Sequence, residues 1–180
     1  MSMSVESIVI ATDLNKTFKA EQKGLDDVQA LQGINMQIKT GQLTALVGPD
    51  GAGKTTFLRL IAGLYEPTTG SLKVLGMDVA KDPQSVQDRI SYMPQKFGLY
   101  EDLSIQENLD LYADLHGVPM DVRKERFARL LKITDLARFT ERPAGKLSGG
   151  MKQKLGLACT LVRSPELLLL DEPSVGVDPL

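Results

Sequence analysis

A glycine-rich loop at residues 48–55 constrains the fold of this chain more than any other segment. It reads G-P-D-G-A-G-K-T and matches every position of the pattern G-x-x-x-x-G-K-[ST]. An apolar run at residues 43–47 precedes it and a helix-like stretch at 56–64 follows, which predicts a strand, a loop and a helix in that order. Glycine lets successive N–H groups turn inward, and the helix directs its positive dipole end at the same point. We therefore expect a binding site for polyphosphate.

Length and composition limit the classes of protein to which the chain can belong. Its 180 residues suit a single domain with a sizeable core. The chain is 42% hydrophobic and 24% charged with a net charge of -2, which argues against disorder and gives no electrostatic basis for binding nucleic acid. Cys159 is the only cysteine, which excludes an internal disulfide and fits a reducing compartment. The N-terminus lacks an export-signal pattern, and no uncharged apolar stretch approaches the ~20 residues that span a bilayer.

The pattern of apolar residues predicts an α/β fold. Short alternating or apolar runs bounded by turn residues predict strands at residues 7–11, 34–38, 43–47, 71–75, 90–93 and 167–170. Gly24 and Gly33 mark turns in the polar segment between the first two strands. The helix after the glycine-rich loop is expected to end near Gly63.

After the fifth of these strands the hydrophobic period changes from two to about 3.6, which predicts helices. Ser104 and Glu107 form a capping box at the start of one helix, a second begins after Pro119, and a third begins after Ser148. Their predicted apolar faces are Ile105, Leu109, Tyr112 and Leu115; then Val122, Phe127, Leu130 and Leu131; then Leu155, Ala158 and Val162. The prediction is one domain over residues 1–180, with an α/β core at 1–97 and 147–180 interrupted by a helical subdomain at 98–146.

Two further segments carry chemistry. Asp171 and Glu172 directly follow the apolar strand at 167–170, and open α/β sheets bind ligands at the carboxyl ends of their strands. We expect Asp171 to contact the magnesium ion of a nucleoside triphosphate through water, Thr55 to offer it a hydroxyl directly, and Glu172 to polarise an attacking water. The segment L-S-G-G-M at 147–151 opens a helix with a second glycine turn, which predicts a second anion site.

Five motifs in a fixed order resemble those of the ATP-binding cassette (ABC) ATPases. They are G-P-D-G-A-G-K-T-T at 48–56, Y-M-P-Q at 92–95, L-S-G-G-M at 147–151, L-L-L-L-D-E-P at 167–173 and S-V-G-V-D at 174–178. The resemblance extends over nearly the whole chain. It implies a P-loop NTPase fold with a RecA-like core, an antiparallel β subdomain and a helical insertion. It also implies ATP hydrolysis with ATP and Mg²⁺ as cofactors.

The resemblance assigns roles to individual residues. The Walker A motif, which holds the phosphates, comprises Gly48, Pro49, Asp50, Gly51, Ala52, Gly53, Lys54, Thr55 and Thr56. Asp171 becomes the Walker B aspartate, Glu172 the catalytic glutamate, and Gln95 the Q-loop ligand of magnesium and water. Phe18 is assigned to stack on adenine. The remaining site residues are the signature residues Ser148, Gly149 and Gly150 and the D-loop aspartate Asp178.

The same resemblance implies partners. Two ABC cassettes pair head to tail, so Ser148 and Gly150 of one subunit would contact the γ-phosphate held by Lys54 of the other. The helical subdomain would dock to a transmembrane permease and so place the chain in the cytoplasm, on the inner face of the cell membrane. The G-G-M signature, the run at 92–103 and the V-G-V-D of the D-loop resemble ABC-2-type exporters, including drug and antibiotic efflux systems.

The chain departs from the family pattern at three places. Met151 replaces the commoner Gln, and Asp50 adds a negative charge where Asn or Ser is usual. The sequence stops at Leu180, directly after the D-loop. We therefore expect the C-terminal part of the core, with its γ-phosphate histidine, to be missing, and these residues alone to pair their sheet poorly and to be weakly active. His116 precedes the Walker B strand and is expected at a helix end.

Two alternatives remain open. One is a soluble ABC ATPase that acts on the ribosome or on nucleic acid, to which a basic stretch would contribute Arg123, Lys124, Arg126, Arg129 and Lys132. Apolar residues alternate with these charges, which favours a solvated amphipathic helix face. The other is an ATP-binding fragment without catalytic activity, and comparing ATP hydrolysis with ATP binding separates it from an enzyme.

Overall fold

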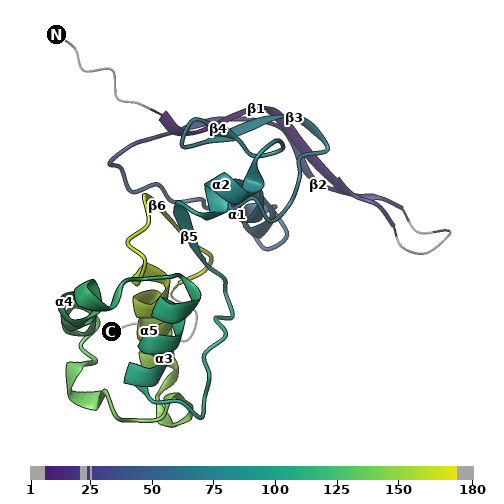
Figure 1. The fold of residues 1–180 in the computed structure, drawn as a ribbon. Coiled ribbons are helices and arrows are strands. Elements are labelled where there is room, and N and C mark those ends of the chain that lie inside the picture. Colours follow the sequence, from purple (N-terminus) through teal and green to yellow (C-terminus); the bar gives the residue numbers. More distant parts are fainter. Residues whose placement is uncertain (1–6, 21–23, 25, 174–180) are drawn as a thin grey trace. The chain divides into compact units, whose positions relative to one another are not determined.

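The computed structural model describes residues 7–20, 24 and 26–173. The chain divides into two compact units, residues 1–90 and 91–180. In the described residues, the first unit contains a four-stranded sheet with two helices, and the second contains three α-helices and a two-stranded sheet that begins at Ile90 (Figure 1). The α/β class and the antiparallel β subdomain are therefore as predicted.

A long antiparallel pair of strands begins the first unit. Strands β1 (Ser7–Phe18) and β2 (Val28–Lys39) include the predicted strands but are longer than predicted. Gly33 lies inside β2 with a φ of 56°, not in a turn, and the strand register shifts opposite it. The side-chain oxygen of Asn15 accepts the Gly33 N–H at 2.8 Å. The prediction of a turn at Gly33 is wrong, because this side chain satisfies the backbone at an irregularity and pairing continues beyond it.

The sheet is completed by β3 (Thr69–Val74) and the short β4 (Met77–Asp78), in the order β2-β1-β3-β4. Two of the pairs across β1 and β3, Val9 with Val74 and Ala11 with Leu72, are apolar and buried. These pairs give the sheet its covered face.

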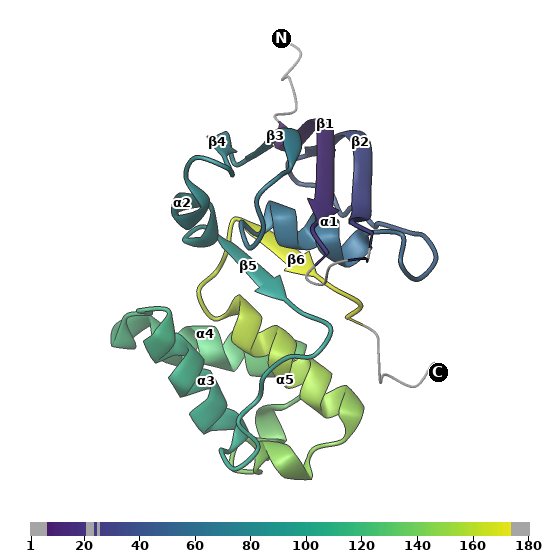
Figure 2. The ribbon, with the colours of Figure 1, turned by 90° about the vertical axis from the view of Figure 1, so that its right-hand side faces the viewer.

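Helices α1 (Lys54–Ile61) and α2 (Pro83–Gln87) lie on the same side of this sheet (Figure 2). The buried α1 residues that contribute to the core are Phe57, Leu60 and Ile61. Gly63 ends the helical segment with a φ of 65°, as predicted, and its carbonyl accepts a 2.8 Å hydrogen bond from the Gln87 side chain. This contact joins the end of α1 to α2, a helix that the sequence analysis did not predict.

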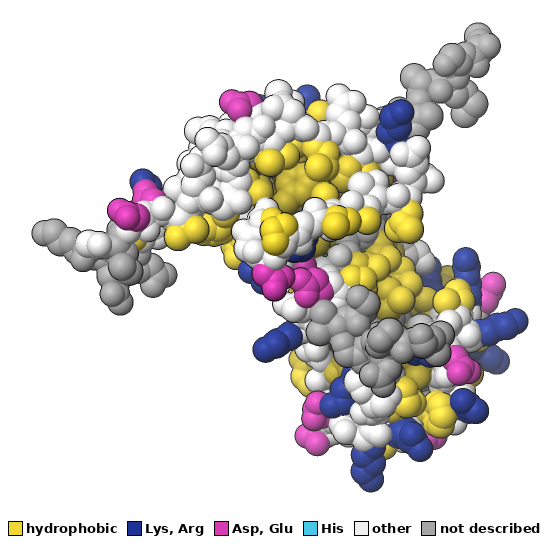
Figure 3. Space-filling view, turned by 180° about the vertical axis from the view of Figure 1, so that it is seen from behind, with side chains coloured by type: hydrophobic (Ala, Val, Ile, Leu, Met, Phe, Trp, Pro, Cys, Tyr) yellow, Lys and Arg dark blue, Asp and Glu magenta, His cyan; other side chains and the backbone are white. Residues whose placement is uncertain are grey.

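The predicted strand at residues 43–47 does not form. The structure has no regular element there, Leu43 is fully exposed and Val47 is 93% exposed. Hydrophobic side chains reach the surface of this unit (Figure 3). A β-strand needs a neighbour that satisfies its backbone groups, and no described strand pairs with residues 43–47. The apolar pattern indicated the capacity to form a strand but not the availability of a partner.

In the second unit, β5 (Ile90–Met93) pairs with β6 (Leu167–Leu170), and both strands were predicted. Their arrows point the same way (Figure 2). The pairing continues one residue past β6, where the Asp171 N–H donates to the Met93 carbonyl at 2.9 Å. The pair therefore fixes the backbone where the acidic residues begin.

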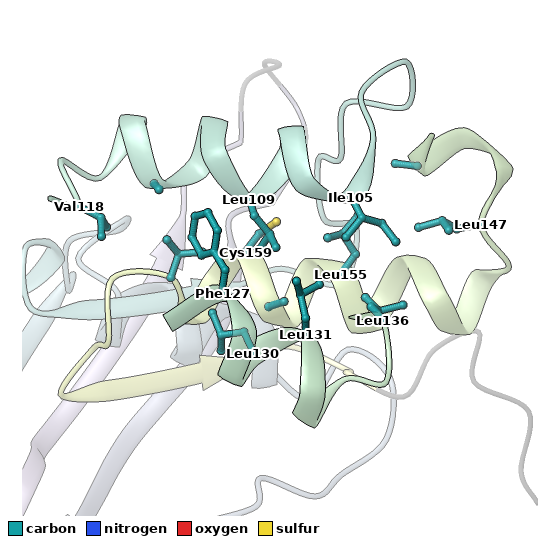
Figure 4. Close-up of a cluster of buried hydrophobic side chains, with 14 residues drawn as sticks. Ile105, Leu109, Val118, Phe127, Leu130, Leu131, Leu136, Leu147, Leu155 and Cys159 are labelled. Carbon is teal, nitrogen blue, oxygen red and sulfur yellow. The ribbon is translucent and has the colours of Figure 1, made fainter. Parts of the chain in front are cut away.

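The three predicted helices of the second unit are α3 (Ile105–Leu115), α4 (Met120–Ile133) and α5 (Gly149–Leu161), with short 3-10 helices η1 (Ala137–Phe139) and η2 (Ala144–Lys146) before α5. The capping box of α3 is present. Apolar side chains from all three helices form one core (Figure 4). Its labelled members are Ile105, Leu109, Val118, Phe127, Leu130, Leu131, Leu136, Leu147, Leu155 and Cys159. No helix in the described residues has both the length and the apolarity needed to cross a bilayer.

The predicted apolar faces of α3 and α4 are wrong at two positions. Leu115 is 64% exposed and Val122 is also exposed. Asn108 is fully buried instead, because its amide donates to the carbonyl oxygens of Tyr100, Leu103 and Ser104, and its own oxygen accepts the Tyr100 N–H. A buried amide with four hydrogen bonds meets the requirement for burying a polar group.

Arg123 is likewise buried, whereas the sequence analysis placed it on a solvated basic face. Its Nε and one terminal nitrogen donate to the Val118 carbonyl at 2.9 and 2.7 Å. Its other terminal nitrogen forms an ion pair with Asp114 Oδ1 at 2.7 Å. Arg126 donates to the Val162 carbonyl at 2.7 Å. Two of the five basic residues of this stretch thus hold the helical unit together, which weakens the case for a nucleic-acid surface on α4.

Candidate nucleotide site

The glycine-rich loop supplies the first part of the candidate site. Gly51 and Gly53 have φ values of 79° and 85°, in the left-handed region that favours glycine. Gly53 is the N-cap of α1 and provides no side-chain cap, so the first-turn amides of this helix are available for an anion. The loop is closed by a 3.2 Å hydrogen bond from the Ala52 N–H to the Pro49 carbonyl. The predicted loop and helix thus form the arrangement that phosphate binding requires.

The position of the loop against β2 depends on Gly53. A Cβ on this residue would lie 2.6 Å from the Ala30 carbonyl oxygen and 2.7 Å from a methyl carbon of Leu31. A Cβ on Gly51 would meet nothing within 4 Å. Gly51 is therefore needed for its backbone angle, and Gly53 for both its angle and its lack of a side chain.

Lys54 places a positive charge at the loop. Its Nζ donates to the carbonyls of Gly48 and Pro49, both at 2.8 Å. Thr55 and Thr56 follow in the first turn of α1 and are partly exposed, while Pro49 and Asp50 are exposed. A ligand with phosphate oxygens can therefore reach the ammonium by replacing these carbonyls as its hydrogen-bond acceptors.

Phe18, the predicted adenine-stacking residue, lies at the end of β1 and is partly exposed. The ring of Tyr65 packs edge-on against it at 5.3 Å between centroids, and Lys16 Nζ lies 5.0 Å from the Phe18 centroid. The sequence analysis missed Tyr65. The signal was an aromatic residue shortly after Gly63, although only the fold could bring it to β1.

The acidic residues after β6 form a second group of predicted site residues, in the unit of residues 91–180. Asp171 is 3% exposed, and its Oδ2 accepts a 3.0 Å hydrogen bond from the hydroxyl of Tyr92 on β5. Glu172 has a φ of 50°, and its Oε2 accepts a 2.9 Å hydrogen bond from the amide of Gln95. The structure thus brings together the two predicted catalytic residues, Gln95 and Glu172. It also adds Tyr92, to which the sequence analysis gave no role although the residue belongs to the Y-M-P-Q motif.

A third group of predicted site residues lies at the start of α5, in the same unit. Ser148 is the N-cap, its hydroxyl oxygen accepts the Met151 N–H at 3.3 Å, and Gly149 and Gly150 form the first turn. Ser148 and Gly149 are exposed, and a Cβ on Gly150 would meet nothing within 4 Å. The amides of this turn are therefore accessible from outside the unit. Asp178, the predicted D-loop residue, lies outside the described residues.

The site residues are distributed over both units. Phe18 and the Walker A residues belong to residues 1–90, whereas Gln95, the signature and the acidic pair belong to residues 91–180. Among the described residues, no three His, Cys, Asp or Glu side chains gather to hold a metal ion. His116 is the exposed C-cap of α3, as expected for a helix end.

Comparison with known proteins identifies the family. A family model described as ABC transporter matches residues 31–175. The probable multidrug ABC transporter ATP-binding protein YbhF of Escherichia coli is 54% identical over 175 residues, which cover 97% of this chain and 29% of that protein. The bacitracin transport ATP-binding protein BcrA of Bacillus licheniformis is 36% identical, over 98% of this chain and 54% of its own length. The chain thus spans about a third to a half of the length of these two relatives.

A solved structure gives the same result. The ATP-binding cassette MJ0796, in a dimeric post-hydrolysis state bound to ADP and Pi, superposes with a TM-score of 0.81 at 28% identity, over 94% of this chain and 76% of that one. The predicted family is therefore confirmed. The chain belongs to the ABC transporter family.

Proposed function

We propose that this chain binds and hydrolyses ATP as the ATP-binding part of an ABC-type exporter. The observation that carries the proposal is the loop at residues 48–55, with an uncapped helix N-terminus behind it and the Lys54 ammonium held by two loop carbonyls. Such a loop offers backbone donors and a movable cation to a polyphosphate at the same place. Residues 48–56 bind the phosphates, and Phe18 stacks on the adenine ring.

The donor set fits Mg²⁺. The Thr55 hydroxyl, the Asp171 carboxylate and the Gln95 side-chain oxygen are hard oxygen ligands, which this ion prefers. Mg²⁺ binds through few protein groups and keeps waters and substrate phosphates. When bound, the ion neutralises charge on the phosphates.

Glu172 is the general base of the proposed reaction. It accepts a proton from the water that attacks the γ-phosphate. The Gln95 amide holds one of its carboxylate oxygens at 2.9 Å, and the positive φ of Glu172 sets the direction in which its side chain leaves the backbone. A residue other than glycine pays an energetic cost to adopt a left-handed backbone. At Glu172 this backbone points the side chain in a different direction from the side chain of Asp171.

Residues 1–97 and 147–180 are proposed to form the RecA-like ATP-binding core, and residues 98–146 the helical subdomain that contacts permease subunits. Ser148, Gly149 and Gly150 of a second cassette complete the site, together with Asp178. The dimeric state of MJ0796 supports such pairing. The names of YbhF and BcrA speak of a multidrug transporter and of bacitracin transport, which supports export of drugs or antibiotics. Docking to the permease would hold the chain at the inner face of the cell membrane.

A binding measurement tests the proposal. In the full-length gene product, Lys54→Ala is expected to weaken the binding of a fluorescent ATP analogue by roughly 10-fold or more, because a hydrogen-bonded charge on the phosphates is lost. Lys73→Ala, which removes an exposed lysine of β3 in the same unit, is the matched control and is expected to bind as the wild type does. Equal binding by both variants would refute the phosphate role of the loop. ATP binding without hydrolysis in the wild type would favour the non-catalytic alternative.

A further inference from the structure

The hydroxyl of Tyr92 reaches the buried Asp171 carboxylate directly. Tyr92 lies on β5 and Asp171 follows β6, the neighbouring strand. Two hydrogen bonds join these segments side by side: the Asp171 N–H donates to the Met93 carbonyl at 2.9 Å, and the Tyr92 hydroxyl donates to Asp171 Oδ2 at 3.0 Å. The first fixes the backbone of Asp171, and the second fixes its side chain.

The burial of Asp171 explains why its carboxylate needs the hydrogen bond from the Tyr92 hydroxyl. The carboxylate is 3% exposed and follows a run of four leucines. A buried carboxylate needs hydrogen-bond donors to offset the loss of water. A donor on Oδ2 restricts rotation of the carboxylate and so sets the direction of Oδ1. The ring of Tyr92 is only partly buried, so core packing alone does not account for a tyrosine here.

Glu172 has a separate partner. Its carboxylate accepts from the Gln95 amide, three residues after Tyr92. The segment at 92–95 thus contributes one hydrogen-bond donor to each of the two adjacent acidic residues. A substitution at Tyr92 can therefore remove the hydrogen bond to the Asp171 carboxylate while leaving the Gln95–Glu172 hydrogen bond in place.

We propose that Tyr92 is a positioning residue that orients the Asp171 carboxylate toward the metal ion of the bound nucleotide. This inference rests on the proposed function, in which Asp171 serves that ion. Partners that orient a metal-binding carboxylate affect metal affinity although they do not touch the metal. In this inference Tyr92 acts through its hydrogen bond to Asp171 alone, so its loss should alter metal affinity and not nucleotide affinity.

The test measures Mn²⁺, used as a spectroscopic probe for Mg²⁺, by electron paramagnetic resonance with the full-length gene product and a non-hydrolysable ATP analogue. Tyr92→Phe is expected to weaken Mn²⁺ binding roughly 10-fold. Binding of the analogue in the presence of EDTA is expected to stay within about twofold of the wild type. The matched control is Tyr112→Phe, which removes a 2.8 Å hydrogen bond to the Gly98 carbonyl in the same unit and is expected to leave Mn²⁺ binding unchanged.

Asp171→Asn separates failure of the inference from failure of the proposed function. If Asp171→Asn binds Mn²⁺ as the wild type does, the metal role of Asp171 and the inference are both wrong. If Asp171→Asn binds Mn²⁺ weakly and Tyr92→Phe binds it normally, only the inference is wrong. When Tyr92→Phe is added to Asp171→Asn, the inference expects a further change of no more than about twofold, because the two residues act as a unit. A full additional loss would show that Tyr92 acts by another route and would overturn the inference.

Discussion

Replacing Gly53 by alanine tests why the glycine-rich loop has its shape. An alanine at either Gly51 or Gly53 must adopt a positive φ, which costs about 1–2 kcal/mol for a residue with a Cβ. At Gly53 the new Cβ would also lie 2.6 Å from the Ala30 carbonyl oxygen. Backbone cannot yield as a flexible side chain does, so this overlap adds about 1–3 kcal/mol, the usual cost of overpacking.

The native-state costs therefore sum to about 2–5 kcal/mol for Gly53→Ala and to about 1–2 kcal/mol for Gly51→Ala. Alanine also reduces the entropy of the unfolded chain, by about 0.4–1 kcal/mol, but this effect is similar in both variants and cancels from their difference. That difference, about 1–3 kcal/mol, is the cost of the overlap between the new Cβ at residue 53 and β2.

The assay is urea denaturation of the full-length gene product and its two variants, with the denaturation midpoints compared at an unchanged slope. A cost for Gly51→Ala equal to or greater than that for Gly53→Ala would refute the assignment of the contact. ATP-analogue binding by Gly53→Ala supplies a second measurement. If the loop moves to relieve the overlap, the start of α1 moves with it, and nucleotide affinity is expected to fall.

Two further predictions concern the second unit. Glu172→Gln in the full-length gene product is expected to lower ATP turnover by roughly 10²-fold or more with ATP binding retained, because general-base catalysis is lost. A phosphate-release assay measures the turnover. Unchanged turnover would show that Glu172 is not the general base. Hydrogen bonds from the backbone N–H and the hydroxyl of Ser104 lower the pKa of Glu107 in the folded protein. The ionised Glu107 carboxylate therefore stabilises the fold fully above its unfolded pKa of about 4.3, and this stabilisation is lost as pH falls through the folded pKa. The stability difference between wild type and Glu107→Gln should therefore shrink in denaturation series at decreasing pH, and a difference independent of pH would contradict the capping box as its source.

The sequence predicted the order of most elements and the chemical type of the site. Strands β5 and β6, the end of α1 near Gly63 and the capping box at Ser104 were found where their residues predicted them. The helix end and the capping box depend on side chains and backbone within a few residues of one another, and the two strands were recognisable from their local apolar runs. The predictions failed at the buried polar residue Arg123, because apolar periodicity does not record which carbonyl groups can accept the hydrogen bonds of a polar side chain. The burial of Asn108, which no apolar pattern indicates, has the same cause.

What the sequence determined by itself is the glycine-rich loop, the acidic strand end and the family, because these follow from local backbone chemistry and the spacing of motifs. Only the tertiary structure decided that Tyr92 donates to Asp171 across two strands distant in the sequence, and that residues 43–47 stay irregular. The physical reason is the same in both cases. A hydrogen bond between distant segments exists only when folding brings a donor to an acceptor, and no local pattern specifies which segment that will be.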